Sequence, residues 1–91
     1  MYRKELSIVN PTGLHARPAA EFCKMASQFE SDIQIKRLAG DSKEGNAKSV
    51  IMLMSMGLSK GTSIEISAEG VDETDAVEAL AQLISDGFGE I

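Results

Sequence analysis

Residues 3–13, RKELSIVNPTG, contain the change of pattern that decides the fold. Up to the turn the side chains alternate, with Lys4, Leu6 and Ile8 on one side, which is typical of a strand with one buried face. Asn-Pro-Thr-Gly at positions 10–13 is strongly turn-forming. The chain is therefore expected to leave a half-buried strand abruptly and to begin a new element after the turn.

The next segment, from Ala16 to about Phe29, has the apolar spacing of a helix. Pro18 falls in its first turn, where a missing N–H costs little because first-turn donors have no partner within the helix. The apolar stripe consists of Ala19, Phe22, Cys23 and Ala26. This pattern predicts a helix that buries one face.

The rest of the chain alternates between the same two patterns. We expect, in order, a strand from Ile33 to Lys36, a hairpin turn at 39–43 with a short strand ending near Asn46, a short helix from Ser49 to Met56 followed by Gly57, a strand from Ser63 to Glu69 and a helix from Asp72 to about Asp86. Asp72 is expected to cap that last helix, with Asp75 as a capping-box-like partner. The order βαββαβα, with strands apolar on one side, predicts a single α+β domain over residues 1–91. Its expected form is an open-faced two-layer sandwich, a four-stranded antiparallel sheet with three helices on one face.

The composition limits the kinds of site that the chain can carry. Its 91 residues have a formal charge of −5, which disfavours nucleic acid as the main partner. The single cysteine, Cys23, excludes an internal disulfide, and the single histidine, His15, excludes a zinc site of several histidines. No apolar run reaches the roughly 18 residues of a membrane span. We therefore expect a cytoplasmic protein, without membrane insertion, metal or cofactor.

The charge is divided unevenly along the chain. Residues 1–60 carry nine basic and six acidic side chains, whereas residues 61–91 carry eight acidic and no basic ones. A site that handles anions is therefore expected in the first part. The alternative is that the last helix simply presents a solvated acidic face.

The sequence around the single histidine suggests a phosphoryl site. His15 is expected at the last loop residue or the N-cap of the first helix, and Arg17 within its first turn. The backbone N–H groups of Ala16 and Arg17, the helix dipole and the guanidinium together favour an anion. A neutral imidazole there could attack a phosphoryl group in line, while the donors stabilise its oxygens. The alternative is a histidine that only ends the loop and an arginine that is only a surface cation.

Two stretches resemble the signatures of a known family. Gly-Leu-His-Ala-Arg-Pro-Ala at 13–19 resembles the active-site signature of HPr, the histidine-containing phosphocarrier of the bacterial phosphoenolpyruvate-dependent phosphotransferase system. Asn-Ala-Lys-Ser-Val-Ile at 46–51 resembles the second signature of this family, and Gly57 with Lys60-Gly61 matches the segment that follows. The expected order of elements also fits.

The resemblance implies a relay. His15 would accept a phosphoryl group on Nδ1 from phosphorylated Enzyme I and pass it to an EIIA-type protein, as a carrier without independent enzymatic turnover. Arg17 would pair with the phosphoryl oxygens, and the N–H groups of Ala16 and Arg17 would complete the phosphate site. The carrier is expected to act as a monomer. The implied partner surface contains Leu14, Ala20, Lys24, Lys48, Val50, Ile51 and Met54.

The same resemblance leaves regulatory roles open. Ser49 matches the regulatory serine of the family, which would imply a kinase and a transcription regulator as further partners; the simpler role is that of an N-cap. Residues 49–51 and 85–88 resemble the nitrogen-related branch, NPr, whose relay controls metabolism or transcription rather than sugar uptake. Two rival classes are a small acyl-phosphate hydrolase, whose Gly-rich phosphate loop is missing here, and an RNA-binding sandwich, which the acidity disfavours.

Overall fold

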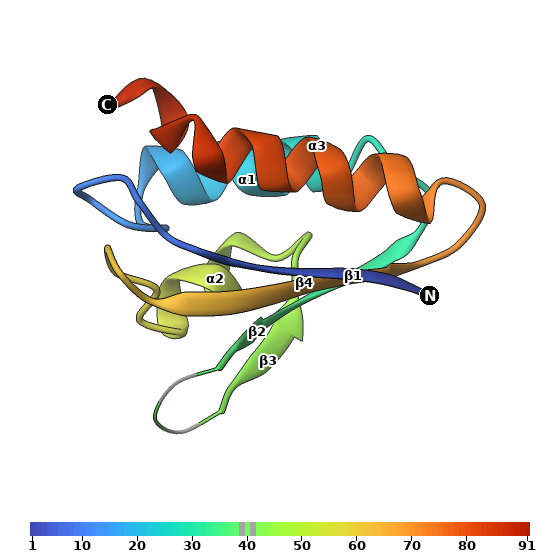
Figure 1. Cartoon of the computed structure of the whole chain (residues 1–91), viewed down its shortest axis with the longest axis horizontal. Helices are drawn as coiled ribbons and strands as arrows, with labels where there is room; N and C mark the ends of the chain where they lie inside the picture. The colour runs from blue at the N-terminus through green and yellow to red at the C-terminus, as the bar shows by residue number, and fades with distance from the viewer. Residues whose placement is uncertain (39, 41) are drawn as a thin grey trace.

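Four strands and three helices follow one another in the order expected from the sequence (Figure 1). The computed structural model describes residues 1–38, 40 and 42–91. The elements are β1 (Tyr2–Ser7), α1 (Arg17–Ala26), β2 (Asp32–Arg37), β3 (Glu44–Asn46), α2 (Val50–Ser55), β4 (Ser63–Glu69), α3 (Glu73–Ser85) and a short 3-10 turn, η1 (Gly87–Gly89). The sequence pattern does not predict this last turn.

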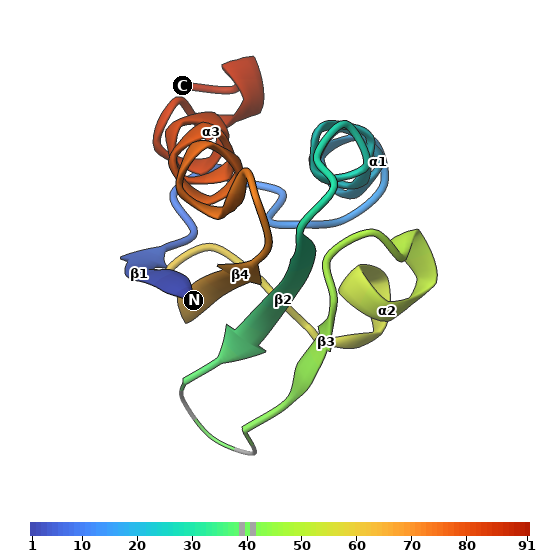
Figure 2. The same ribbon diagram turned by 90° about the vertical axis from the view of Figure 1, so that its right-hand side faces the viewer.

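The strands form one antiparallel sheet in the order β1-β4-β2-β3. β4 therefore lies inside the sheet, and the N-terminal strand β1 lies at its edge. Figure 2 shows α1, α2 and α3 on the same side of the sheet, with α2 beside β3. The predicted open-faced α+β sandwich is confirmed.

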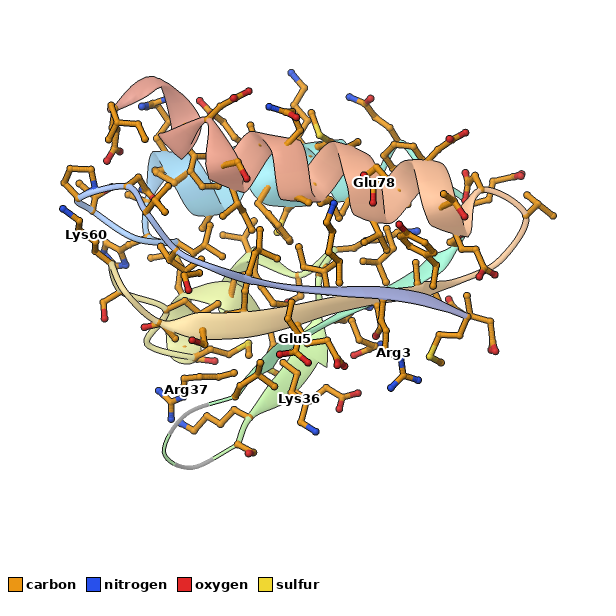
Figure 3. All side chains as sticks on the ribbon, in the orientation of Figure 1. Arg3, Glu5, Lys36, Arg37, Lys60 and Glu78 are labelled. Atoms are coloured by element: carbon orange, nitrogen blue, oxygen red, sulfur yellow. The ribbon has the colours of Figure 1, made fainter. Side chains whose placement is uncertain are left out.

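The strand register separates an apolar from a polar face. Ile66 lies opposite Ile35, and both side chains are buried under the helices. Burial of such side chains supplies most of the driving force for folding. Arg3, Glu5 and Lys36 project from the other face, away from the helices (Figure 3). The alternation that predicted half-buried strands is clearest along β2 and β4, whereas the edge strand β1 has no fully buried residue within its bounds.

The bounds of α1 differ from the sequence expectation. The helix begins at Arg17 and not at Ala16, which is its N-cap, and it ends at Ala26 rather than near Phe29. β3 is the short strand expected before Asn46. The hairpin turn predicted at 39–43 includes positions 39 and 41, which lie outside the described residues. α2 agrees well with its prediction, because Ser49 caps its first turn and Gly57 follows its end with a φ of +66°.

The sequence predicts that Asp72 caps α3. Asp72 does occupy the N-cap position, but its side chain makes no capping hydrogen bond to the helix. Its carboxylate instead accepts hydrogen bonds from the backbone N–H groups of Glu30, at 2.9 Å, and of Ser31, at 3.0 Å, and from the Ser31 hydroxyl. The Ser31 hydroxyl and these N–H groups hold the pKa of Asp72 below its usual value. Asp72 thus satisfies donors of the turn between α1 and β2, which would otherwise lack partners.

Among the described residues, no helix is both long and apolar enough to cross a membrane.

Candidate functional site

His15 lies on an exposed turn between β1 and α1. It borders a shallow hollow of about 130 Å³, to which the end of α2 and the following loop also contribute. The hollow is lined by Thr12, Leu14, His15, Met54, Gly57, Leu58 and Ser59. The imidazole is therefore open to a partner molecule.

Gly13 brings this turn against the loop after α2. The N–H of Leu14 donates to the carbonyl of Leu58 at 2.8 Å. A Cβ atom on Gly13 would lie 2.4 Å from that carbonyl oxygen, and φ of Gly13 is +69°. Both the close approach and the left-handed backbone favour glycine here. The glycine of the signature thus positions the histidine-bearing turn.

Ala16 has a strained backbone at the start of α1. Its φ is 51° and its ψ is −121°, in a region that a residue with a Cβ atom rarely adopts. Among the described residues, no acceptor is bonded to the backbone N–H of Ala16 or of Arg17. Such donors at the positive end of a helix suit an anion. In the described part of the chain, α1 therefore begins with two N–H groups without an acceptor, directly after His15.

Arg17 is held by acidic groups from two parts of the chain. Its Nη1 is paired with the carboxylate of Glu21, one helical turn further along α1. Its Nη2 donates to the carbonyl of Phe88 at 3.4 Å and lies 4.0 Å from Oε2 of Glu90. The guanidinium thus lies beside the helix start, where the sequence places it, but with carboxylate partners that the sequence analysis missed.

Glu90 connects the C-terminal segment to the turn before His15. Its carboxylate accepts hydrogen bonds from the Thr12 hydroxyl at 2.7 Å, from the Thr12 N–H at 3.2 Å and from the buried Asn10 amide at 3.3 Å. The Thr12 hydroxyl bond is the main reason why the pKa of Glu90 lies below its usual value. The acidic last third of the chain therefore contributes Glu90 beside the site, whereas His15 and Arg17 come from the first part, as the charge distribution predicted.

A sequence signal for this C-terminal contact exists. Phe88 lies between two glycines, Gly87 and Gly89, and all three residues have positive φ angles. The phenyl ring is buried in the core, which anchors this left-handed turn. A large apolar residue between glycines at the end of an amphipathic helix indicates that the chain folds back rather than fraying.

The residues predicted for the partner surface fall into two groups. Val50, Ile51 and Met54 are exposed on α2, with Ile51 82% and Met54 40% accessible. Ala20 and Lys24 are exposed on α1. Leu14 is an exception, because it is 2% exposed and packs in the core, so that it can only form the floor of the hollow.

Lys48 and Ser49 both make structural bonds before α2. The ammonium of Lys48 donates to the carbonyl of Phe29 at 2.8 Å. This bond places the charged group of Lys48 beside the turn that follows α1. The Ser49 hydroxyl accepts from the N–H of Met52 at 3.2 Å and so caps α2. The N-cap role expected of Ser49 is confirmed.

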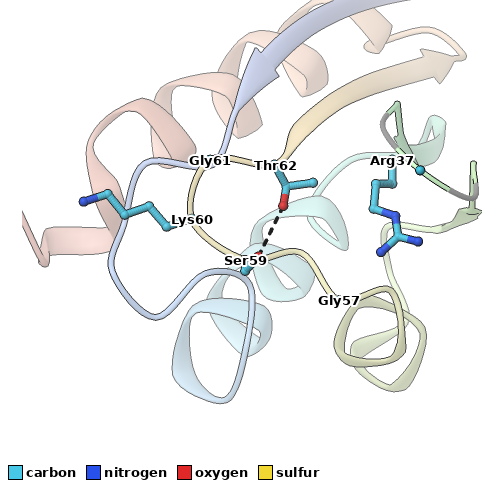
Figure 4. A pocket seen from close by; sticks show the side chains of 7 residues that line it. Arg37, Gly57, Ser59, Lys60, Gly61 and Thr62 are labelled. Carbon is cyan, nitrogen blue, oxygen red and sulfur yellow. Dashed lines mark hydrogen bonds between the residues drawn. The ribbon is translucent and has the colours of Figure 1, made fainter.

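A larger, open hollow of about 500 Å³ lies next to the first (Figure 4). It shares Gly57 and Ser59 with the hollow of His15. Figure 4 shows the side chains of Arg37 and Lys60 pointing in different directions, and Nη1 of Arg37 donates to the carbonyl of Met56 at 2.8 Å. His15, the candidate nucleophile, lines only the smaller hollow.

Among the described residues, no group of three or more His, Cys, Asp or Glu side chains could hold a metal ion.

We compared the chain with known protein families and structures. A model of the family described as "PTS HPr component phosphorylation site" matches residues 2–86. The chain belongs to the HPr family. The phosphocarrier protein HPr of Neisseria meningitidis is 41% identical over 90 residues, which cover 99% of this chain and 98% of that protein.

Solved HPr structures have the same fold. The crystal structure of HPr-C-His from Thermoanaerobacter tengcongensis superimposes with a TM-score of 0.92 and 47% identity, covering 100% of this chain and 99% of the other. An HPr dimer from the same organism gives a TM-score of 0.75 and 48% identity, with coverage of 99% and 100%. The protein is thus similar to HPr phosphocarriers over its whole length, including the turn that carries His15.

Proposed function

We propose that the protein carries a phosphoryl group from phosphorylated Enzyme I to an EIIA-type protein, with His15 as the acceptor through Nδ1. The observation that carries this proposal is the position of His15, exposed beside a helix start whose N–H groups and guanidinium suit an anion. Membership of the HPr family supports the same chemistry. The relay is proposed to take place in the cytoplasm, with the protein as a monomer.

The proposed transfer step uses the imidazole as a nucleophile. The lone pair of Nδ1 attacks phosphorus and forms a P–N bond, while the bond between phosphorus and its donor atom on Enzyme I breaks and the bonding electron pair leaves with that donor atom. Negative charge on the equatorial oxygens is stabilised by the N–H groups of Ala16 and Arg17 and by the guanidinium of Arg17. Arg17 would exchange the carboxylates of Glu21 and Glu90 for the phosphoryl oxygens, because the dianion carries more charge.

The arrangement favours holding a phosphoryl group over hydrolysing it. No Asp or Glu lies between Ile8 and Ala20, so the stretch that carries His15 supplies no local base that could activate water. We therefore infer a carrier whose turnover depends on its two protein partners. The exposed apolar side chains of Val50, Ile51 and Met54, with Ala20 and Lys24 nearby on α1, are proposed as the surface that both partners use in turn.

The proposal is tested by incubating the protein with Enzyme I and phosphoenolpyruvate and measuring its intact mass. A gain of one phosphoryl group is expected, which is stable in base and labile in acid, as for a phosphoramidate. His15→Ala should remove the gain, and Ser49→Ala should retain it. The absence of a gain, or a gain that persists in His15→Ala, contradicts the proposed function.

A regulatory role at Ser49 is the second candidate. Ser49 caps α2 directly before Val50 and Ile51, so that a phosphate on its hydroxyl would add charge at the edge of the proposed partner surface. Incubation with an ATP-dependent kinase from the same cell should phosphorylate the protein but not Ser49→Ala. A pull-down of a transcription regulator by the phosphorylated form would favour this role, and genes for nitrogen control beside the coding sequence would favour the NPr branch.

A further inference from the structure

We propose that Met54 is an oxidation site through which peroxides slow the transfer of phosphoryl groups to His15. Met54 lies on α2, is 40% exposed and lines the same hollow as His15. The exposure gives an oxidant access to the thioether, and the shared hollow places any chemical change beside the acceptor. This inference rests on the proposed function, because its consequence is measured as a transfer rate.

The other methionines near the site have different surroundings. Met56 is 1% exposed, and burial protects a thioether from oxidants in solution. Met52 is 39% exposed but packs over β3, where a Cβ atom on Gly45 would lie 2.2 Å from its Cγ. The Ser55 hydroxyl lies 3.7 Å from the Met52 sulfur and could donate to a sulfoxide formed there. Oxidation of Met52 would thus be accommodated outside the hollow.

The proposed reaction is a two-electron transfer of one oxygen atom. The sulfur lone pair of Met54 attacks one oxygen of hydrogen peroxide, the S–O bond forms and the O–O bond breaks. The departing hydroxide takes up the peroxide proton and leaves as water. Sulfur is oxidised to the sulfoxide and the peroxide is reduced. A thiol-dependent methionine sulfoxide reductase can return the thioether, so the modification is reversible.

A sulfoxide at Met54 changes the wall of the hollow from apolar to polar. Its oxygen is a strong acceptor with partial negative charge, which opposes the approach of an anionic phosphoryl group. It also adds a polar group beside exposed Val50 and Ile51, and a docking partner must then desolvate that group. We expect the initial rate of phosphoryl transfer from Enzyme I to fall on the order of 10-fold.

The experiment compares variants before and after treatment with hydrogen peroxide, each against its own untreated rate. Peptide mass mapping identifies which methionines have gained oxygen, and circular dichroism checks that the fold persists. Met54→Leu replaces the thioether by a side chain of similar size that peroxide does not oxidise. Met52→Leu is the matched control on the same helix, and Met54→Gln carries a polar group without any oxidant.

Four results are expected together. Peroxide slows the wild type and Met52→Leu to a similar degree, leaves Met54→Leu at its untreated rate, and the reductase restores the wild type. Met54→Gln is slow without treatment. The inference is overturned if Met54 oxidises without slowing transfer, or if Met54→Leu remains as sensitive as the wild type. An untreated wild type that takes up no phosphoryl group contradicts the proposed function instead, and the inference about its rate fails with it.

Discussion

The hydroxyl of Thr12 donates to Oε2 of Glu90 at 2.7 Å, a contact between residues 78 positions apart. The N–H of Thr12 donates to Oε1 of the same carboxylate at 3.2 Å. Because Glu90 also lies 4.0 Å from the guanidinium of Arg17, one side chain bonds the turn before His15 and lies close to the cation beside it. The C-terminal segment is thus part of the site.

Replacing Glu90 by Gln should reduce the acid sensitivity of the fold. Hydrogen bonding from Thr12 lowers the pKa of Glu90 below the usual value of 4.5, so the folded state favours the ionised carboxylate. This contribution to stability is present above pH 4.5 and is lost as the pH falls through the lowered folded pKa. Melting temperatures between pH 7 and pH 3 should therefore fall less steeply in Glu90→Gln than in the wild type. Glu69→Gln, on the open face of the sheet, controls for the loss of one charge; identical slopes in Glu90→Gln and the wild type would contradict the prediction.

Arg17→Ala should slow phosphoryl transfer by about 10- to 1000-fold, by analogy with the loss of oxyanion donors. The physical reason is the loss of a cation beside the transferred oxygens. Arg17→Lys should have an intermediate rate, because it keeps the charge but not the two-pronged geometry of the guanidinium. Single-turnover transfer from phosphorylated Enzyme I measures both variants. A wild-type rate in Arg17→Ala would show that the guanidinium serves only its carboxylate partners.

Ala16→Gly should stabilise the protein by about 1 kcal/mol. Relief of the strained φ of 51° is worth about 1–3 kcal/mol, and the greater freedom of glycine in the unfolded chain costs roughly 0.5–1 kcal/mol. Ala20→Gly, at an exposed helical position of α1, should destabilise by about 0.5–1 kcal/mol. Urea denaturation of both variants measures the difference. Equal losses of stability would show that the backbone at Ala16 carries no strain.

Gly13→Ala should destabilise the fold by about 2–4 kcal/mol. The new methyl group would meet the Leu58 carbonyl at 2.4 Å and the Ser59 Cα at 2.8 Å, in addition to the strain of a φ of +69°. Gly61→Ala separates the two effects, because its φ is +91° but nothing lies within 4 Å of the added atom. We expect it to cost only about 1–2 kcal/mol. Similar losses in the two variants would argue against the close approach of the two loops.

The local patterns predicted the fold because each element has one apolar side. Ile35 and Ile66 alternate with polar residues along β2 and β4, and the structure pairs them under the helices. Ser49 and Gly57 likewise mark the ends of α2 through local chemistry. These features depend on residues close together in the sequence, which a pattern can describe.

The site was only partly predictable, because several of its contacts join distant segments. His15 and Arg17 belong to one short stretch and could be recognised there. The bond between Glu90 and Thr12 depends on how the C-terminal turn packs. The carboxylate of Asp72 likewise accepts a hydrogen bond from the distant Ser31 N–H instead of capping α3. Leu14 has an apolar side chain that suits either a surface patch or the core, and its burial is decided by the packing around it.

The two ends of the chain offer very different places for a fused label. The α-amino group of Met1 pairs with Glu73 at the start of α3, at the end of the molecule opposite to the C-terminus (Figure 1). Ile91 follows directly after Glu90, which is bonded to the turn before His15. A dye attached after Ile91 will report on events at the histidine but can obstruct a docking protein. An affinity tag or surface tether placed before Met1 will leave that face turned toward solution.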